Sequence, residues 1–211
     1  MTHISKSVFQ SAHAFKAVLL MSSVLGLSLF SQLSHAEKAD SLQKANINAE
    51  YTNFAGKMSK LVLTGSVKLT RGSLLITAEQ ATSVRDANGA LFAVLTGENG
   101  KPVTFKQKRD GGPDLWIEGK ADRIEYDEKT ELVKFINKAH VKYLNGKEVT
   151  DEFESAFFSY DSLNDVFIGT NSNTGKRVPG AGVVTITQQA KKAKSEKTEK
   201  TEKENQPEGK K

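Results

Sequence analysis

Few side chains in this sequence could carry out catalysis or hold a metal ion. Four histidines are present, and three of them, His3, His13 and His35, fall in the first 36 residues. The fourth, His140 in "KAHVKY", lies on the polar side of an alternating segment, and the chain contains no cysteine. A lone strand histidine without cysteines cannot form the usual nitrogen- and sulfur-ligated zinc site or a Cys-His dyad. We therefore expect His140 to be an ordinary surface residue, and we expect neither catalytic residues, nor a metal, nor a cofactor.

Close pairs of acidic residues are the remaining candidates for acid–base chemistry, namely Asp127–Glu128, Glu152–Glu154 and Asp161–Asp165. A glycosidase needs two carboxyl groups that converge from different strands, and sequence alone does not show convergence. Carboxylates are also common at turns because they accept hydrogen bonds from nearby backbone. A secreted β-rich glycan hydrolase that uses paired carboxylates stays open as an alternative function.

The first 36 residues have the composition of a secretory signal peptide. Lys6 and Lys16 lead into the apolar stretch "AVLLMSSVLGLSLF" (17–30), and "SHA" (34–36) offers a cleavage site. A basic start, a short apolar run and small residues before the cut define this signal, whereas a membrane span needs about 20 apolar residues. We expect a mature chain that starts at Glu37, outside the cytoplasm. The alternative is an uncleaved N-terminal anchor, and N-terminal sequencing distinguishes the two.

Residues 191–211 form a tail of mostly Lys, Glu and Thr. Its eight Lys and five Glu give a net charge of +3, and nothing in it suits a core, so we expect it to be solvated and disordered. Residues 37–190 contain twenty basic and twenty acidic side chains. A net-neutral body argues against a nucleic-acid-binding protein, because its basic surface would lie on the folded part.

The body, residues 37–190, is long enough for one domain and consists of short alternating segments. Apolar and polar residues alternate in "LVLTGSVKL" (61–69), "PVTFKQ" (102–107) and "LVKFI" (132–136), and turn sequences such as "DANG" separate such segments. Alternation bounded by turns indicates β-strands, and many strands in series indicate an all-β sandwich, barrel or roll. Residues 37–45 allow one helical turn, and residues 77–84 favour a continued strand.

A faint internal repeat relates two strand–turn–strand units. The copies are offset by 72 residues, so that Leu63 corresponds to Phe135 and Gly65 to Asn137. A repeated unit with the same apolar face predicts stacked hairpins that share one core. Gly65 and Asn137 interrupt otherwise regular strands, so we expect both to be bends that curve the sheet.

The apolar faces carry large side chains, which are Phe92, Phe105, Trp116 or its neighbours, Tyr126, Phe135, Tyr143, Phe157, Phe158, Tyr160 and Phe167. The residues alone leave two explanations open. Either two sheets pack face to face and fill the space between them, or this space stays open along an edge and takes an apolar ligand.

Three motifs follow one another along the body. They are "LVLTGSVKLTRG…ITAEQA" (61–81), "GKPVTF" (100–105) and the pattern A-x-x-I-x-Y in "ADRIEY" (121–126). In this order they resemble the OstA-like family of periplasmic lipopolysaccharide-transport proteins, and the resemblance runs from about residue 45 to residue 176. The segment "FINKA" (135–139) departs from the family's usual hydrophobic-T-G-N-A pattern.

The resemblance implies an all-β fold, a twisted open antiparallel β-jelly-roll with an apolar groove. It implies a non-enzymatic periplasmic protein that shelters the acyl chains of lipopolysaccharide and bridges the inner and outer membranes during transport and outer-membrane assembly. The implied partners are lipopolysaccharide and the inner- and outer-membrane transport components with related β-jelly-roll domains. The residues expected to line the groove are Ile47, Leu61, Leu63, Val67, Leu69, Leu74, Ile76, Phe92, Phe105, Ile117, Ile124, Phe135 and Val141.

Both ends of the strand series have weakly protected edges. The N-terminal edge, "ANINAEYT" (45–52), carries one charge, Glu50, and the C-terminal edge, "GVVTITQQ" (182–189), carries none. Edge strands are usually protected by charge, proline or a bulge. Two different unprotected edges suit head-to-tail pairing, so we expect a head-to-tail homo-oligomer. The alternative is a monomer whose chain ends fold over the edges.

Overall fold

The computed structural model describes residues 36–55 and 60–190. The predicted signal peptide, apart from Ala36, and the predicted Lys/Glu tail lie outside the described residues. Within the described ranges, no helix is long and apolar enough to cross a membrane. The elements are α1 (Ala36–Asp40), β1 (Asn46–Asn48), β2 (Tyr51–Ala55), β3 (Lys60–Arg71), β4 (Leu74–Arg85), β5 (Leu91–Thr96), β6 (Val103–Lys108), β7 (Leu115–Ala121), β8 (Arg123–Asp127), β9 (Leu132–Asn145), β10 (Glu148–Asp161), β11 (Val166–Thr170) and β12 (Thr185–Gln188).

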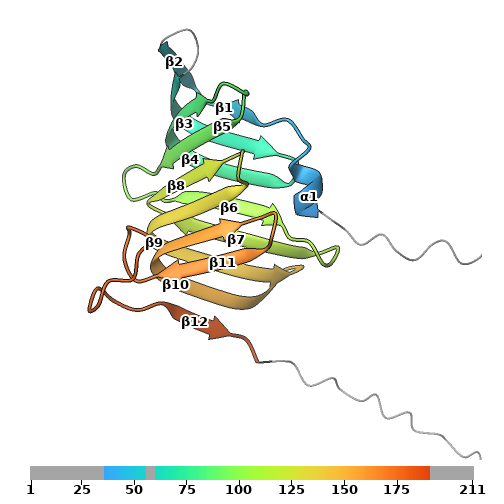
Figure 1. Cartoon of the computed structure of the whole chain (residues 1–211), viewed down its shortest axis with the longest axis vertical. Coiled ribbons are helices and arrows are strands. Elements are labelled where there is room, and N and C mark those ends of the chain that lie inside the picture. Colours follow the sequence, from blue (N-terminus) through green and yellow to red (C-terminus); the bar gives the residue numbers. More distant parts are fainter. Residues whose placement is uncertain (1–35, 56–59, 191–211) are drawn as a thin grey trace, which may run out of the picture.

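The twelve strands of the described residues form one continuous antiparallel sheet. Successive strands are stacked along the long axis of the molecule, and each runs across it (Figure 1). α1 lies in the segment where one helical turn is predicted, and β4 runs without a break through residues 77–84, as predicted. The alternation of apolar and polar residues therefore identifies the strands correctly.

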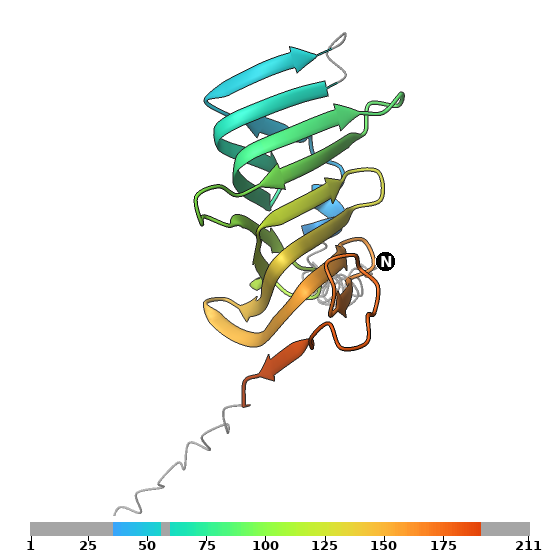
Figure 2. The same ribbon diagram turned by 90° about the vertical axis from the view of Figure 1, so that its left-hand side faces the viewer.

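Four long strands, β3, β4, β9 and β10, each pair with different partners in their two halves. The first half of β3 pairs with β2, and its second half pairs with β1. The first half of β4 pairs with β6, and its second half pairs with β5. The first half of β9 pairs with β8, and its second half pairs with β7. The first half of β10 pairs with β12, and its second half pairs with β11. The network therefore folds into two layers, one with β2, β5, β8 and β11, and the other with β1, β6, β7 and β12 (Figure 2).

The bends that separate the halves lie at Gly65 and Asn137, as the repeat predicts. Gly65 and Ser66 have φ values of 80° and 47°, and the corresponding Asn137 and Lys138 have φ values of 67° and 48°. At each bend the register of the long-strand pair shifts. Each bend carbonyl also accepts a backbone hydrogen bond from within its own copy, and the two donors occupy equivalent positions: Glu50 N donates to Gly65 O at 3.0 Å, and Asp122 N donates to Asn137 O at 3.0 Å.

The hairpin turns lie at the opposite edge from the bends, which we call the open side. Turns 72–73 and 109–114 belong to the second layer, and turns 128–131 and 162–165 belong to the first layer. The inner faces of the two layers bury the apolar core between them. In the middle of the molecule the layers touch, because the rings of Phe105 and Phe135 meet edge to face with centroids 5.2 Å apart.

Candidate functional site

Most of the residues predicted to line a groove lie in the space between the two layers. Leu61 and Ile47 are half-buried at one end of this space, where they pack against the core. The ten that are fully buried are Leu63, Val67, Leu69, Leu74, Ile76, Phe105, Ile117, Ile124, Phe135 and Val141. The inner faces are therefore mainly apolar, and their middle is filled by side chains.

The placement of Phe92 on this apolar face is wrong. Phe92 lies on the outer face of β5 with 36% of its surface exposed, while its neighbours Leu91, Ala93 and Leu95 point inward. The segment "LFAVL" is apolar in both phases of the alternation, so the period of two does not decide which face is buried.

The space between the layers opens near the N-terminal end of the strand series. A hollow of about 270 Å³ lies there, between Ala45, Asn46 and Ile47 on one side and Leu61, Ser83, Val84, Arg85 and Leu91 on the other. Ala45 directly precedes β1 and Ile47 lies in it, in the second layer, whereas Leu61 belongs to the half of β3 in the first layer. This hollow therefore leads into the apolar space from its end.

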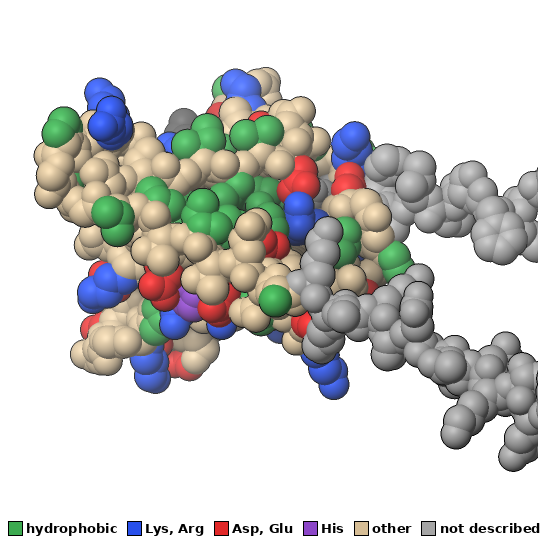
Figure 3. All heavy atoms as spheres, turned by 90° about the horizontal axis from the view of Figure 1, so that it is seen from below, with side chains coloured by type: hydrophobic (Ala, Val, Ile, Leu, Met, Phe, Trp, Pro, Cys, Tyr) green, Lys and Arg blue, Asp and Glu red, His purple; other side chains and the backbone are tan. Residues whose placement is uncertain are grey.

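The opposite end of the space is occupied by aromatic rings. Phe167 in β11 stacks on Phe158 with centroids 4.7 Å apart, and it meets Phe153 of the second layer at 5.1 Å. Tyr143 completes the cluster at 5.2 Å from Phe153. Seen from this end, apolar side chains gather in the middle of the molecule and reach the surface (Figure 3). Exposed Ile168 and Ile186 lie on the two terminal strands here, β11 and β12.

The open side is crossed by a buried arginine. Arg71 ends the second-layer half of β3 and is 6% exposed. Its Nη1 donates to the Tyr126 hydroxyl at 2.9 Å and to the Glu131 carboxylate, both of which belong to the first layer, and its Nε lies 3.7 Å from Glu128. Arg71 thus ties the two layers together.

The same arginine also holds the N-terminal segment on the open side. Its Nε donates to the Gln43 carbonyl at 3.0 Å, and its Nη2 donates to the Ser41 carbonyl. Asp40, the buried residue before Ser41 and the last residue of α1, accepts hydrogen bonds from the Ser73 backbone N at 2.7 Å and from Gln107 Nε2 at 3.2 Å. Residues 40–43 therefore form part of the wall of the roll.

A second arginine crosses the open side nearer the aromatic end. Arg109, in the β6–β7 turn, forms a two-pronged contact with Asp165 in the β10–β11 turn, Nη2 to Oδ2 at 2.7 Å and Nε to Oδ1 at 3.2 Å. The Arg109 guanidinium lies 3.9 Å from the centroid of the Tyr143 ring, and the Tyr160 hydroxyl donates to Asp165 at 3.2 Å. This ion pair thus lies directly over the aromatic cluster.

Burial governs the ionisation of the Arg71 cluster. It raises the pKa of Glu131 above its ordinary value, and the hydrogen bond from Arg71 acts against this shift. Burial also raises the pKa of Tyr126 well above its ordinary value, so its hydroxyl stays neutral. For Arg71, burial acts to lower the pKa, but the bonds to Glu131 and Tyr126 raise it overall. The cluster therefore contains one permanent positive charge that faces Glu131 and Glu128.

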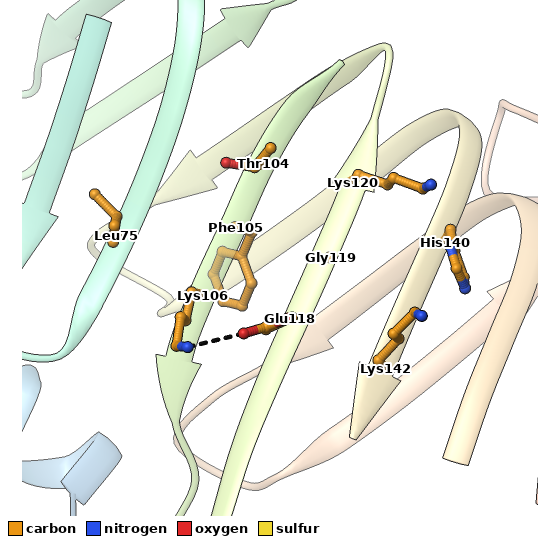
Figure 4. A pocket seen from close by; sticks show the side chains of 9 residues that line it. All are labelled: Leu75, Thr104, Phe105, Lys106, Glu118, Gly119, Lys120, His140 and Lys142. Carbon is orange, nitrogen blue, oxygen red and sulfur yellow. Dashed lines mark hydrogen bonds and ion pairs between the residues drawn. The ribbon is translucent and has the colours of Figure 1, made fainter. Parts of the chain in front are cut away.

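A hollow of about 350 Å³, with several charged side chains in its lining, lies on the outer face of β6, β7 and β9 (Figure 4). Lys106 pairs with Glu118 at 2.8 Å, and Lys142 pairs with Glu152 at 2.5 Å. His140 lies 3.7 Å from Glu152, and burial together with Lys120 and Lys142 lowers its pKa. Positive and negative side chains alternate on this face, as is typical of a solvated sheet surface.

The acidic pairs have structural contacts in place of a shared cleft. Asp127 accepts from the Lys129 backbone N at 2.9 Å, and Asp161 accepts from the Leu163 backbone N at 3.1 Å, so both cap their own turns. Across residues 36–55 and 60–190, no group of three or more His, Cys, Asp or Glu side chains is arranged to hold a metal ion.

The residues that the sequence reasoning missed are the polar ones that face inward. Arg71 follows Val67 and Leu69 in the same phase, Gln107 follows Val103 and Phe105, and Glu131 precedes Val133 and Phe135. A polar side chain in phase with buried apolar residues must find a partner. A charged residue at an apolar position of the alternation is therefore the sequence feature that could have identified Arg71 and Glu131.

This two-layered roll belongs to a known class of transport protein. Residues 46–163 match the sequence model of the family described as "LptA/(LptD N-terminal domain) LPS transport protein". The chain belongs to this family. Its function is therefore transport of lipopolysaccharide and not enzymatic catalysis, and nothing supports the alternative of a glycan hydrolase.

The chain is also similar to two individual proteins of lipopolysaccharide transport. The lipopolysaccharide export system protein LptA of Haemophilus influenzae is 29% identical over 163 residues, which cover 77% of this chain and 90% of that protein. The crystal structure of LptH from Pseudomonas aeruginosa superposes with a TM-score of 0.61 at 20% identity, over 72% of this chain and 99% of that chain. LptH is described as the LptA-homologous periplasmic component of the lipopolysaccharide transport device. This likeness confirms the predicted fold.

Proposed function

We propose that this protein binds lipopolysaccharide by enclosing its acyl chains between the two layers. The observation that carries the proposal is the apolar inner face, which is continuous from the hollow at Ile47 and Leu61 to the aromatic cluster. Each methylene removed from water contributes about 0.8 kcal/mol. An amphiphile with several acyl chains therefore needs such an enclosure in order to cross an aqueous compartment.

The proposed lining consists of the inward-facing residues of the alternation. Because the layers touch at Phe105 and Phe135, the layers must part, or these rings must rotate, before a chain can pass the middle. The proposed lining residues are Ile47, Leu61, Leu63, Val67, Leu69, Leu74, Ile76, Phe105, Ile117, Ile124, Phe135 and Val141.

The proposed location is the periplasm, where the chain bridges the inner and outer membranes. The signal-like composition of residues 1–36 and the description of LptH as a periplasmic component support this location. We assign residues 37–190 to the roll and residues 191–211 to a solvated tail.

The proposed assembly is head to tail, among copies of this chain and with related rolls of the membrane-bound components. In the described part of the chain, β1 and β2 pair with β3 alone, and β11 and β12 pair with β10 alone. Each end of the roll thus offers strand edges with free backbone groups, and apolar Tyr51 and Ile186 are exposed beside them. Pairing of unlike ends would make the apolar spaces of neighbouring rolls continuous.

Photocrosslinking from adjacent residues of one strand tests the groove. Leu61 is half-buried and lines the hollow, whereas Val62 points outward and is 41% exposed. A photoreactive residue at position 61 should capture lipopolysaccharide, and the same residue at position 62 should not. Equal capture at both positions, or capture at position 62 alone, would contradict the proposed enclosure.

A further inference from the structure

We propose that Arg109 selects the head group of the bound amphiphile, by exchanging Asp165 for a phosphate group at the junction of acyl chains and sugar. This inference rests on the proposed function, because it requires acyl chains between the layers. It concerns the open side, where the part of the amphiphile that stays in water must leave the roll.

The geometry of an enclosed amphiphile places its head group on the open side. The bends are continuous strands, so the edge at Gly65 and Asn137 is closed by backbone. The opposite edge consists of turns, and side chains connect the turns of the two layers there. A ligand with chains inside and sugar outside must therefore emerge between these side chains.

Of the two arginines that cross this side, Arg71 is closed to a ligand. It is 6% exposed, and its three nitrogens are engaged by Tyr126, Glu131 and the carbonyls of residues 41 and 43. Any ligand would have to displace the N-terminal segment as well as Glu131. Arg71 therefore fastens the layers permanently.

Arg109 is open to exchange. Its partner Asp165 is exposed at 38% of its side chain, and the Arg109 side chain is exposed at 17%. If Asp165 leaves, water and the Tyr160 hydroxyl still solvate its carboxylate. Arg109 itself remains held over the Tyr143 ring, because a cation above an aromatic face is attracted without an anionic partner.

The chemistry of the pair favours a phosphate group as the replacement. Arg109 already offers two nitrogens side by side to the two oxygens of Asp165, and the same planar fork fits two phosphate oxygens. A phosphate attached to acyl chains would gain the buried contacts of those chains as well. Free phosphate would gain only the ionic contact, which water and salt weaken at a partly exposed site.

The site also explains how binding could open the roll. Arg109 and Asp165 belong to turns of different layers, so their ion pair is a fastening between the layers. When a phosphate replaces Asp165, this fastening is released at the end where the aromatic rings of Phe153 and Phe167 fill the space. Head-group recognition and entry of the chains then occur at one place.

Competition between two amphiphiles that differ by one group tests the proposal. The purified protein is loaded with an apolar fluorescent probe at low salt, and the probe is displaced with a lysophosphatidic acid or with the monoacylglycerol of the same acyl chain. We expect the phosphate-bearing amphiphile to bind about tenfold more tightly than the neutral one. Arg109→Gln should reduce this preference to about twofold or less, and Asp165→Asn should increase it because the competing carboxylate is gone. Inorganic phosphate alone should not displace the probe.

Arg123→Gln is the matched control. Arg123 also pairs with a carboxylate, Glu125, but on the outer face of β8, so this variant should keep the preference of the unaltered protein. Thermal midpoints show that each variant is folded, and Asp165→Asn tests the site in the opposite direction from Arg109→Gln.

Each outcome decides between the two proposals. If both amphiphiles bind the unaltered protein equally, or Arg109→Gln keeps the preference, the head-group assignment is wrong while the enclosed groove stands. If inorganic phosphate competes as well as the lysophosphatidic acid, the site binds free anions and the assignment is also overturned. If neither amphiphile displaces the probe, the proposed function itself fails, and the head-group assignment falls with it.

Discussion

Arg71 occupies an inward position of β3 at which an apolar side chain would be expected. A buried charge is tolerated when it is paired and fully hydrogen-bonded, and here Glu131, Tyr126 and two backbone carbonyls provide those partners. The cluster joins three parts of the chain that lie far apart in sequence. Its contribution is therefore to fix how the two layers and the N-terminal segment lie relative to each other.

Removal of Arg71 should be far more costly than removal of an exposed arginine nearby. Arg71→Ala leaves Glu131 buried without its partner, so the free energy of unfolding should fall by ~3–5 kcal/mol. Arg85→Ala is the control, because the Arg85 side chain is 51% exposed and lies 3.9 Å from Glu128, and it should cost less than ~1 kcal/mol. Urea denaturation measures both values, and similar losses in the two variants would contradict this account of Arg71.

His140 should make stability depend on pH in the mildly acidic range. Its pKa is lowered by burial and by Lys120 and Lys142, with Glu152 and Glu154 acting in the opposite direction. The unfolded chain therefore takes up a proton first as the pH falls below about 6.5. The protein should lose stability from that pH downward until the folded form is protonated as well. His140→Gln should remove this part of the loss between pH 7 and pH 5, and an unchanged pH profile of the thermal midpoint in this variant would contradict the shift.

At the scale of elements, the two copies of the bend show what the roll requires from its long strands. In both copies two consecutive residues adopt positive φ, yet one copy uses Gly65–Ser66 and the other Asn137–Lys138. The absent "TG" pattern in "FINKA" therefore changes the residues but not the geometry. Asparagine adopts this backbone region more readily than most residues with a side chain, which is why the second copy still bends.

Replacement of Gly65 should cost more stability than replacement of a glycine that also has a positive φ angle but has open space where a Cβ would lie. A Cβ at Gly65 would lie 2.5 Å from the Glu50 carboxylate, whereas a Cβ at Gly89 meets nothing within 4 Å. Both have positive φ, so either alanine variant should lose ~1–2 kcal/mol to backbone strain. Gly65→Ala should lose more than Gly89→Ala, because Glu50 must also move. Equal losses in chemical denaturation would show that the contact with Glu50 is unimportant.

The sequence predicts the strands and bends well because each depends on local patterns. The period of two identifies β3, β4 and β9, and the repeat identifies both bends. The period of two does not determine which face carries Phe92, because both phases of its segment are apolar. It also does not reveal the pairing of Arg71 with Glu131 or of Arg109 with Asp165, because the residues of each pair are separated by more than 50 positions. Such contacts depend on how the layers are placed, which the local pattern does not contain.

At the scale of the whole molecule, the two ends differ in the side chains that they present. The N-terminal end has the hollow lined by Ile47 and Leu61, whereas the C-terminal end has the aromatic cluster around Phe167. A structure with unlike ends can extend indefinitely by head-to-tail contacts, but like ends would close as a dimer.

Adding a charge to one terminal strand should prevent the proposed assembly. Ile186 in β12 is 59% exposed, so Ile186→Lys should leave the fold intact and make the strand edge unfavourable for pairing. Light scattering across a concentration series should show a rising mass for the unaltered protein and a constant monomer mass for this variant. Asn88→Lys, in the exposed β4–β5 turn, is the control and should behave like the unaltered protein. A constant monomer mass for all three proteins would count against head-to-tail assembly.

The long strands also determine how the molecule responds to force. Its strands run across the long axis (Figure 1). Tension between the two ends therefore breaks the row of hydrogen bonds between one pair of neighbouring strands before it breaks the next row. Where β3 pairs with β4 and β9 pairs with β10, the same two strands remain paired in both layers, with a shift of register at the bend. Rupture there must separate both layers together, whereas β2 and β11 can each detach alone. Mechanical failure under stretching would therefore begin at the outermost strands and leave the middle of the roll folded.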